Sequence, residues 1–207
     1  MTNCYQTQYA FSFRAVSYQE KYVLASQSFS IPVKQWTALI GKSGQGKTTL
    51  LKTLLRLVPG LESYPPTLSI SYMPQRDLLL PWKTAIENVM LGATLRGETP
   101  NIAQAKTLLN SVGLGAETNH YPHQLSVGMR QRVALARTLM EDADLILMDE
   151  PFSAVDSQTR QQLHTLSKTH LKEKTVLIVS HDLNEVEKLA DHVMTLRGDP
   201  AVCLIDS

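Results

Sequence analysis

An eight-residue segment rich in glycine has the residue types of a phosphate-binding loop. Residues 41–48 read Gly-Lys-Ser-Gly-Gln-Gly-Lys-Thr and match G-x-x-x-x-G-K-[ST] at every fixed position. Glycines let the backbone wrap closely around an anion and point its N–H groups at phosphate oxygens. Lys47 would face the β- and γ-phosphates of a nucleotide, and the Thr48 hydroxyl would bind Mg²⁺. The alternative is a glycine turn with a chance lysine, which a predicted strand before it and a predicted helix after it disfavour.

Two carboxylates follow an apolar segment further along the chain. Residues 145–148 are Leu-Ile-Leu-Met, typical of a strand buried on both faces, and Asp149 and Glu150 come next. Ligands of α/β folds bind at the carboxyl ends of strands, so this pair would face a bound nucleotide. Asp149 is suited to hold Mg²⁺, and Glu150 to act as the general base on an attacking water. The alternative is a pair of acids that only caps a helix, which the phosphate-binding loop disfavours.

The elements that must position these groups alternate between strand and helix at both ends of the chain. Strands are predicted at 11–14, 28–31, 36–40, 68–73, 145–148, 176–179 and 193–196. Helices are predicted at 48–58, 85–95, 102–112, 127–140, 159–171 and 183–189. This order predicts a largely parallel α/β core from residues 1–74 and 141–207, with an α-helical lobe inserted at 75–140.

Composition narrows the classes of protein. The 207 residues include 20 Lys plus Arg and 19 Asp plus Glu, a net charge of +1, so no nucleic-acid partner is expected. With 43% hydrophobic residues the chain can bury a core, which excludes intrinsic disorder. Only two cysteines occur, which indicates a reducing compartment, and no apolar run is long enough to cross a bilayer. We therefore expect a soluble, cytoplasmic protein.

Further motifs in a fixed order resemble those of one family. Residues 125–132, Leu-Ser-Val-Gly-Met-Arg-Gln-Arg, resemble the LSGGQ signature of ABC-type ATPases. Gln75 is similar to the Q-loop glutamine of that family, and His181 to its switch histidine. Residues 153–156, Ser-Ala-Val-Asp, are similar to its D-loop, with valine where leucine is usual. Tyr18 resembles the aromatic residue that stacks on adenine, and Tyr22 is a rival for that role.

The resemblance extends from residue 18 to residue 181 and is to an ABC transporter ATP-binding subunit. It implies a P-loop NTPase (RecA-like) core with the helical lobe inserted. The antiparallel β-arm that follows the phosphate-binding loop would be shortened, because residues 59–73 are all that represent it. The Leu-Leu-Pro-Trp stretch at Leu79–Trp82, together with residues 128–132, is similar to the nitrate, sulfonate, taurine and thiamine-precursor importer ATPases.

The resemblance implies ATP and Mg²⁺ as ligands and gives each residue a role. Glu150, His181 and Gln75 would be catalytic, and Thr48, Gln75 and Asp149 would hold Mg²⁺. The residues that would contact ATP are Tyr18, Gly41, Ser43, Gly44, Gly46, Lys47, Thr48, Thr49, Ser126, Gly128 and Asp156.

Part of this set would act across a dimer interface. In the family, ATP lies between the phosphate-binding loop of one subunit and the signature helix of a second copy, which implies a two-fold dimer. Ser126 would be the N-cap of that helix, and Asp156 would cross the interface. We expect the bare backbone of Gly128 to face the partner's γ-phosphate, and Val127, where glycine is usual, to point away.

The family also implies other partners. An integral membrane permease subunit would carry the transport path and a solute-binding protein would complete the complex, with this chain peripheral on the cytoplasmic face of the inner membrane. The apolar residues of Leu78–Trp82 would either belong to the core of the lobe or rim a groove for the permease's coupling helix, and we favour the groove for some of them. A soluble ABC-type ATPase without a transport role is the main alternative, and a nucleotide-dependent module without hydrolysis is a further one.

Overall fold

The computed structural model describes residues 7–18 and 21–206, and the contacts divide the chain into two compact units. Unit 1 consists of residues 1–70, 143–149 and 173–207. Unit 2 consists of residues 71–142 and 150–172. No helix of the described segments is long and apolar enough to cross a membrane.

A largely parallel sheet forms the centre of unit 1. Its strands, in spatial order, are β2 (Val16–Tyr18), β3 (Lys21–Leu24), β11 (Ala201–Asp206), β10 (His192–Gly198), β5 (Trp36–Ile40), β9 (Thr175–Val179) and β8 (Leu145–Asp149). The pairs β10–β5, β5–β9 and β8–β9 are parallel. Every residue of β8 and β9 is buried, as the apolar runs at 145–148 and 176–179 predict.

Because of the register of this sheet, the three segments that follow β5, β8 and β9 start at the same end of the sheet. Leu39 and Asp149 both pair with Val179, so β5, β9 and β8 end at the same level. The glycine-rich loop follows β5, Asp149 is the last residue of β8, and Ser180 and His181 follow β9. A ligand is therefore expected at the carboxyl ends of these strands, as in other parallel sheets.

A second sheet in unit 1 is antiparallel and has the order β4–β1–β6. Its strands are β1 (Gln8–Phe13), β4 (Gln27–Pro32) and β6 (Leu61–Ser63). The rings of Phe11 and Phe29 stack at 5.7 Å between centroids, and Phe13 packs edge-on against Phe29 at 6.0 Å. The expected arm is thus built mostly from the N-terminal strands, because residues 59–73 add only the short strand β6 to this sheet.

Among the residues of unit 1 that the structure describes, two helices occur, α1 (Lys47–Leu54) and α7 (Leu183–Leu189). The prediction that the first helix extends to Val58 is wrong. Leu57 N–H donates to the Lys52 carbonyl and Arg56 N–H to the Thr53 carbonyl, while Arg56 has a left-handed φ of 58°. This is the Schellman pattern that ends helices, and a non-glycine residue adopts it here.

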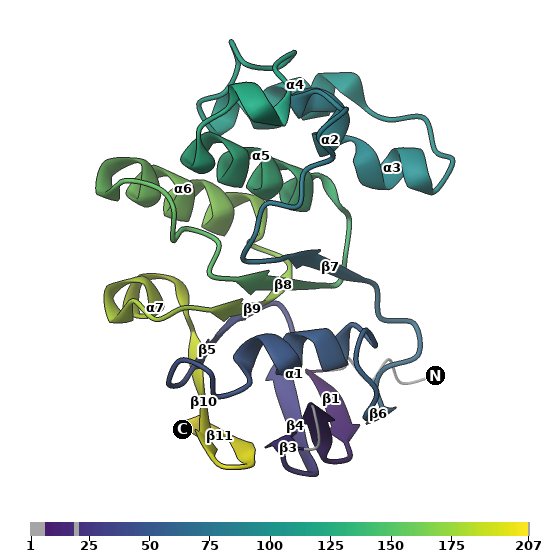
Figure 1. The fold of residues 1–207 in the computed structure, drawn as a ribbon, viewed down its shortest axis with the longest axis vertical. Coiled ribbons are helices and arrows are strands. Elements are labelled where there is room, and N and C mark those ends of the chain that lie inside the picture. Colours follow the sequence, from purple (N-terminus) through teal and green to yellow (C-terminus); the bar gives the residue numbers. More distant parts are fainter. Residues whose placement is uncertain (1–6, 19–20, 207) are drawn as a thin grey trace. The chain divides into compact units, whose positions relative to one another are not determined.

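Unit 2 is built around helices that pack on α5 (Figure 1). Its elements are β7 (Ile70–Met73), which begins at the unit boundary, α2 (Ala85–Val89), α3 (Leu91–Leu95), α4 (Ile102–Ser111), the 3₁₀ turn η1 (Pro122–Gln124), α5 (Val127–Met140) and α6 (Ser157–His170). The bounds predicted for α5 are confirmed. The single helix predicted at 85–95 is wrong, because the chain leaves helical geometry at Met90 and forms α2 and α3.

Unit 2 contains more of the chain than the helical lobe expected at residues 75–140. Residues 150–172, which include α6, belong to it by contact. One cause is the buried side chain of Gln131 in α5, whose amide donates to the Glu150 carbonyl and accepts from the Ala154 N–H. The helix that carries the signature is thereby joined to the segment that follows β8.

Candidate nucleotide-binding and catalytic site

The glycine-rich loop of unit 1 has the shape of an anion cradle. Gly44 and Gly46 have left-handed φ values of 75° and 96°. A Cβ on Gly46 would lie 2.8 Å from a methyl of Val23, and one on Gly41 would lie 2.9 Å from the Leu196 carbonyl oxygen. Gly46 is also the N-cap of α1 and has no side chain to cover the first N–H groups of that helix. The residues present therefore fit a bound phosphate chain.

Lys47 lies with its ammonium inside the loop. Its Nζ donates to the carbonyls of Gly41 at 2.8 Å and Lys42 at 3.0 Å. The Gln45 side chain accepts from the Lys42 N–H at 2.7 Å and supports the same turn. Since these partners are neutral carbonyls, the ammonium is held in place while its positive charge stays available to an anion.

Two of the predicted Mg²⁺ ligands lie together at the edge of the sheet. The Thr48 hydroxyl donates to Oδ2 of Asp149 at 2.7 Å, and the Asp149 side chain is buried. A hydroxyl and a carboxylate that converge in this way are oxygen donors of the kind Mg²⁺ prefers, so the residues fit the ion. The third predicted ligand, Gln75, belongs to unit 2 and is described below.

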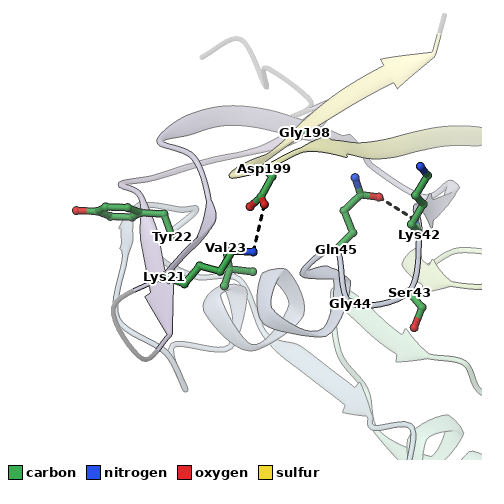
Figure 2. Close-up of a pocket in the computed structure, with 9 residues that line it drawn as sticks. All are labelled: Lys21, Tyr22, Val23, Lys42, Ser43, Gly44, Gln45, Gly198 and Asp199. Atoms are coloured by element: carbon green, nitrogen blue, oxygen red, sulfur yellow. Dashed lines mark hydrogen bonds and ion pairs between the residues drawn. The ribbon is translucent and has the colours of Figure 1, made fainter.

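A pocket of about 280 Å³ adjoins the loop in unit 1 (Figure 2). It is lined by Lys21, Tyr22, Val23, Lys42, Ser43, Gly44, Gln45, Gly198 and Asp199. Lys21 and Asp199 form an ion pair of 3.1 Å there, which the sequence motifs did not indicate. Tyr22 is 57% exposed, and Figure 2 shows its ring directed away from the loop residues. Tyr18 is in β2, but its side chain lies outside the described part of the structure.

Gln75 and Glu150 are brought together within unit 2. The Gln75 amide donates to Oε2 of Glu150 at 3.1 Å. Glu150 has a left-handed φ of 50°, unusual for a residue with a side chain. Its carbonyl accepts from the Ser153 hydroxyl at 3.0 Å and from the Gln131 amide at 3.1 Å. The predicted base is therefore held at both its carboxylate and its backbone.

The signature segment begins α5 as predicted. Ser126 is the N-cap, and its hydroxyl accepts from the Met129 N–H at 3.2 Å. The Val127 side chain is 59% exposed. At Gly128 an added Cβ would lie 2.9 Å from the Ala154 carbonyl oxygen. Within this chain the glycine is needed for contact with the D-loop, a reason that the sequence did not suggest.

Asp156 and His181 end two loops on different units. Asp156 is the exposed N-cap of α6, and the bond from the Thr159 N–H to its Oδ1, at 2.9 Å, lowers the pKa of the Asp156 carboxyl. His181 is exposed and follows the buried Ser180 at the end of β9. The Ser180 hydroxyl accepts from the Asp182 N–H at 3.1 Å, which fixes the turn that carries His181.

Comparison with known proteins adds to this geometry. The family model described as "ABC transporter" matches residues 24–153. The chain belongs to the ABC transporter family. An uncharacterized ABC transporter ATP-binding protein of Haemophilus influenzae is 43% identical over 171 residues, which cover 79% of this chain and 71% of that protein. The aliphatic sulfonates import ATP-binding protein SsuB 1 of Paracoccus denitrificans is 39% identical over 188 residues, covering 87% and 76%.

A solved structure supports the same assignment. A dimeric ATP-binding cassette in a post-hydrolysis state, bound to ADP and Pi, matches with a TM-score of 0.79 and 28% identity. The match covers 91% of this chain and 94% of that one. The predicted P-loop NTPase fold is confirmed, and this member of the ABC transporter family is an ATP-binding and ATP-hydrolysing transporter subunit.

Proposed function

We propose that this ABC ATPase hydrolyses ATP through Glu150 and powers import through a separate integral membrane permease. The observation that carries the proposal is the hydrogen bond between the Gln75 amide and the Glu150 carboxylate, because it fixes a base beside the last residue of β8. The name of the Paracoccus denitrificans relative, an import protein for aliphatic sulfonates, supports the import role, and we take organic sulfonates as candidate substrates.

The residues of unit 1 would bind the nucleotide. Lys47 and the N–H groups at the start of α1 would hold the β- and γ-phosphates. Thr48 and Asp149 would hold Mg²⁺. The ion, when bound, neutralises charge on the phosphate oxygens. The pocket beside the loop, with Tyr22 and Val23 in its lining, would take the nucleoside.

Glu150 would accept the proton of the attacking water. A carboxylate that acts as a base must point in a fixed direction, and the amide of Gln75 gives it one. His181, exposed at the end of β9, would donate a hydrogen bond to the γ-phosphate. In-line attack needs only positioning and charge stabilisation from the protein, which these residues supply.

A second copy of the chain would complete the site. The N-terminus of α5, a helix of 14 residues, presents Ser126 and the N–H groups of its first turn for a phosphate of the partner. Asp156 is exposed at the start of α6, where it would cross the interface. The dimeric state of the related cassette bound to ADP and Pi supports this arrangement.

The permease would dock on an apolar groove of unit 2. The groove has a volume of about 290 Å³ and includes Leu78, Leu91 and Leu95 in its lining. Leu78 is 62% exposed, whereas Leu79 is 8% exposed. Leu79 is therefore part of the core, and Leu78 would be the loop residue that contacts the permease. The permease, with a solute-binding protein, would place this chain on the cytoplasmic face of the inner membrane.

Glu150→Gln tests the catalytic part of the proposal. The amide has the size of the carboxylate but is not a base, so ATP turnover is expected to fall by at least about 100-fold while ATP still binds. Size-exclusion chromatography with ATP is expected to show more dimer than for the parent protein. Glu187→Gln, on the exposed side of α7, is the matched control and should keep parental turnover. Parental turnover by Glu150→Gln would contradict the role of the base.

Leu78→Asp tests the docking surface. The variant is expected to bind ATP normally and to lose most of its assembly with the permease in co-purification, because a charge replaces an exposed apolar contact. Leu57→Asp is the control, since Leu57 is equally exposed but lies in unit 1 after α1. Assembly that is unchanged by Leu78→Asp would place the permease elsewhere.

A further inference from the structure

The buried amide of Gln131 holds the segment that follows Glu150. Gln131 is in α5 and is 5% exposed. Its Nε2 donates to the Glu150 carbonyl at 3.1 Å and to the Ser153 hydroxyl at 3.3 Å, and the Ala154 N–H donates to its Oε1 at 2.8 Å. Both ends of the amide are thus used by one short loop.

That loop needs external support. Glu150 is a non-glycine residue with a φ of 50°, a conformation that persists only where the surroundings impose it. The Ser153 hydroxyl donates to the same Glu150 carbonyl at 3.0 Å and so adds a local bond to the one from α5. Without the Gln131 amide, the backbone of Glu150 would be free to relax, and its carboxylate would turn with it.

The same face of α5 makes a second contact with this loop. Gly128 is three residues before Gln131, which places both on one side of the helix. Its Cα is so close to the Ala154 carbonyl oxygen that a Cβ would lie 2.9 Å from that oxygen. The first turns of the signature helix and residues 150–154 are therefore packed as one piece.

We propose that Gln131 is a positioning residue for the general base, and that it couples the signature helix to Glu150. This rests on the proposed roles of Glu150 and of the Ser126 end of α5. A displacement of α5 when its N-terminus meets the partner's nucleotide would reach the Glu150 carbonyl through one side chain. The base of one subunit would in this way respond to the nucleotide that the other subunit holds.

Asn88 supplies a matched control for a purely structural amide. It is also fully buried in unit 2, and its Nδ2 donates to the carbonyls of Leu80, Lys83 and Thr84. Its Oδ1 accepts from the Leu80 N–H at 2.8 Å. Loss of either amide leaves buried polar groups without partners and lowers stability, but only Gln131 holds the Glu150 loop.

The test compares Gln131→Met with Asn88→Leu, each close in size to the residue it replaces. Thermal unfolding, the Kd for ATP and kcat at saturating ATP are measured, with kcat taken well below both unfolding midpoints. Both variants are expected to unfold earlier. For Gln131→Met, kcat is expected to fall at least about tenfold with a Kd within about twofold, whereas Asn88→Leu keeps kcat within about twofold.

Gln131→Glu refines the comparison, because it can still accept from the Ala154 N–H but cannot donate to the Glu150 carbonyl. Its kcat is expected to fall at least as far as that of Gln131→Met, because a buried carboxylate oxygen would then face the Glu150 carbonyl oxygen. If Gln131→Met does not fold, Ser153→Ala takes its place, because it removes a bond to the same carbonyl, and a severalfold fall in kcat is expected. The proposal is overturned if kcat stays parental in these variants, or if Asn88→Leu loses as much.

Glu150→Gln separates this inference from the proposed function. If Glu150→Gln is inactive and Gln131→Met is fully active, the base is assigned correctly and only the coupling fails. If Glu150→Gln turns over at the parental rate, the role of Glu150 fails and the coupling fails with it.

Discussion

The two halves of the candidate site are built in different ways. The phosphate-binding loop of unit 1 is one continuous segment, in which the Lys47 ammonium contacts carbonyls five and six residues before it. The Glu150 loop of unit 2 is held by side chains from far along the chain, 75 residues away for Gln75 and 19 for Gln131. A loop made of neighbours in sequence can be recognised from its pattern, whereas the bonds that hold the Glu150 loop join distant residues and are visible only after folding.

The largest predicted effect is on nucleotide binding by the phosphate-binding loop of unit 1. Lys47→Ala is expected to weaken ATP binding by at least about 100-fold, because it removes charge-assisted bonds to two phosphates. Isothermal titration of the nucleotide measures this. Lys52→Ala, on the exposed side of the same helix, is the control and should leave the affinity unchanged. An unaltered Kd in Lys47→Ala would remove the basis for a phosphate site in this loop.

The signature helix gives the next effect. Gly128→Val is expected to lower ATP turnover by more than about tenfold, because its Cβ would meet the Ala154 carbonyl and displace the Glu150 loop. Val127→Gly should change turnover by less than about tenfold, since Val127 is exposed and valine costs a helix only a few tenths of a kcal/mol. Steady-state assays at high subunit concentration compare the two. Equal effects would mean that contact with the D-loop is not what selects glycine at 128.

Much of the fold could be predicted because its signals are local. The strands β5, β8 and β9 are mostly apolar, and α5 has helical spacing with a serine at its start. Other elements have no such signal. The strands β2 and β3 are only three and four residues long, and β11 depends on its pairing with β10. The end of α1 and the break at Met90 follow from backbone angles that side-chain patterns do not reveal.

The residues of the candidate site also fall into those that local sequence motifs identify and those that only tertiary contacts identify. The loop at 41–48, Asp149 and Ser126 could be assigned from short motifs, and the Thr48–Asp149 and Gln75–Glu150 contacts agree with that assignment. Gln131 lies within the signature segment, but its role could not be assigned from the sequence, because that role depends on the Glu150 carbonyl that its side chain meets in the fold. Long-range bonds between side chain and backbone are set by tertiary packing and leave no periodic trace.

The smallest predicted effect asks whether every long-range bond near β8 serves catalysis. Ser69 and Asp144 are 75 residues apart, like Gln75 and Glu150. Asp144 directly precedes the first residue of β8, whereas Glu150 directly follows its last residue. Oδ2 of Asp144 accepts from the Ser69 hydroxyl at 2.6 Å and from its N–H at 3.0 Å, and these bonds lower the pKa of the Asp144 carboxyl. A group with a lowered folded pKa stabilises the fold above its unfolded pKa and loses that contribution as pH falls through the folded value.

Asp144→Asn keeps an acceptor and removes the charge. It is expected to lower the free energy of unfolding at pH 7 by less than about 1 kcal/mol, since the pair is exposed, and to leave kcat unchanged. The difference from the parent should shrink below about pH 4, where the parental carboxyl takes up its proton. Urea unfolding of both proteins at pH 7 and at about pH 3 measures this. A tenfold loss of kcat in Asp144→Asn would instead show that ATP turnover depends on bonds at both ends of β8. The Ser69–Asp144 bond could then not be assigned to stability alone.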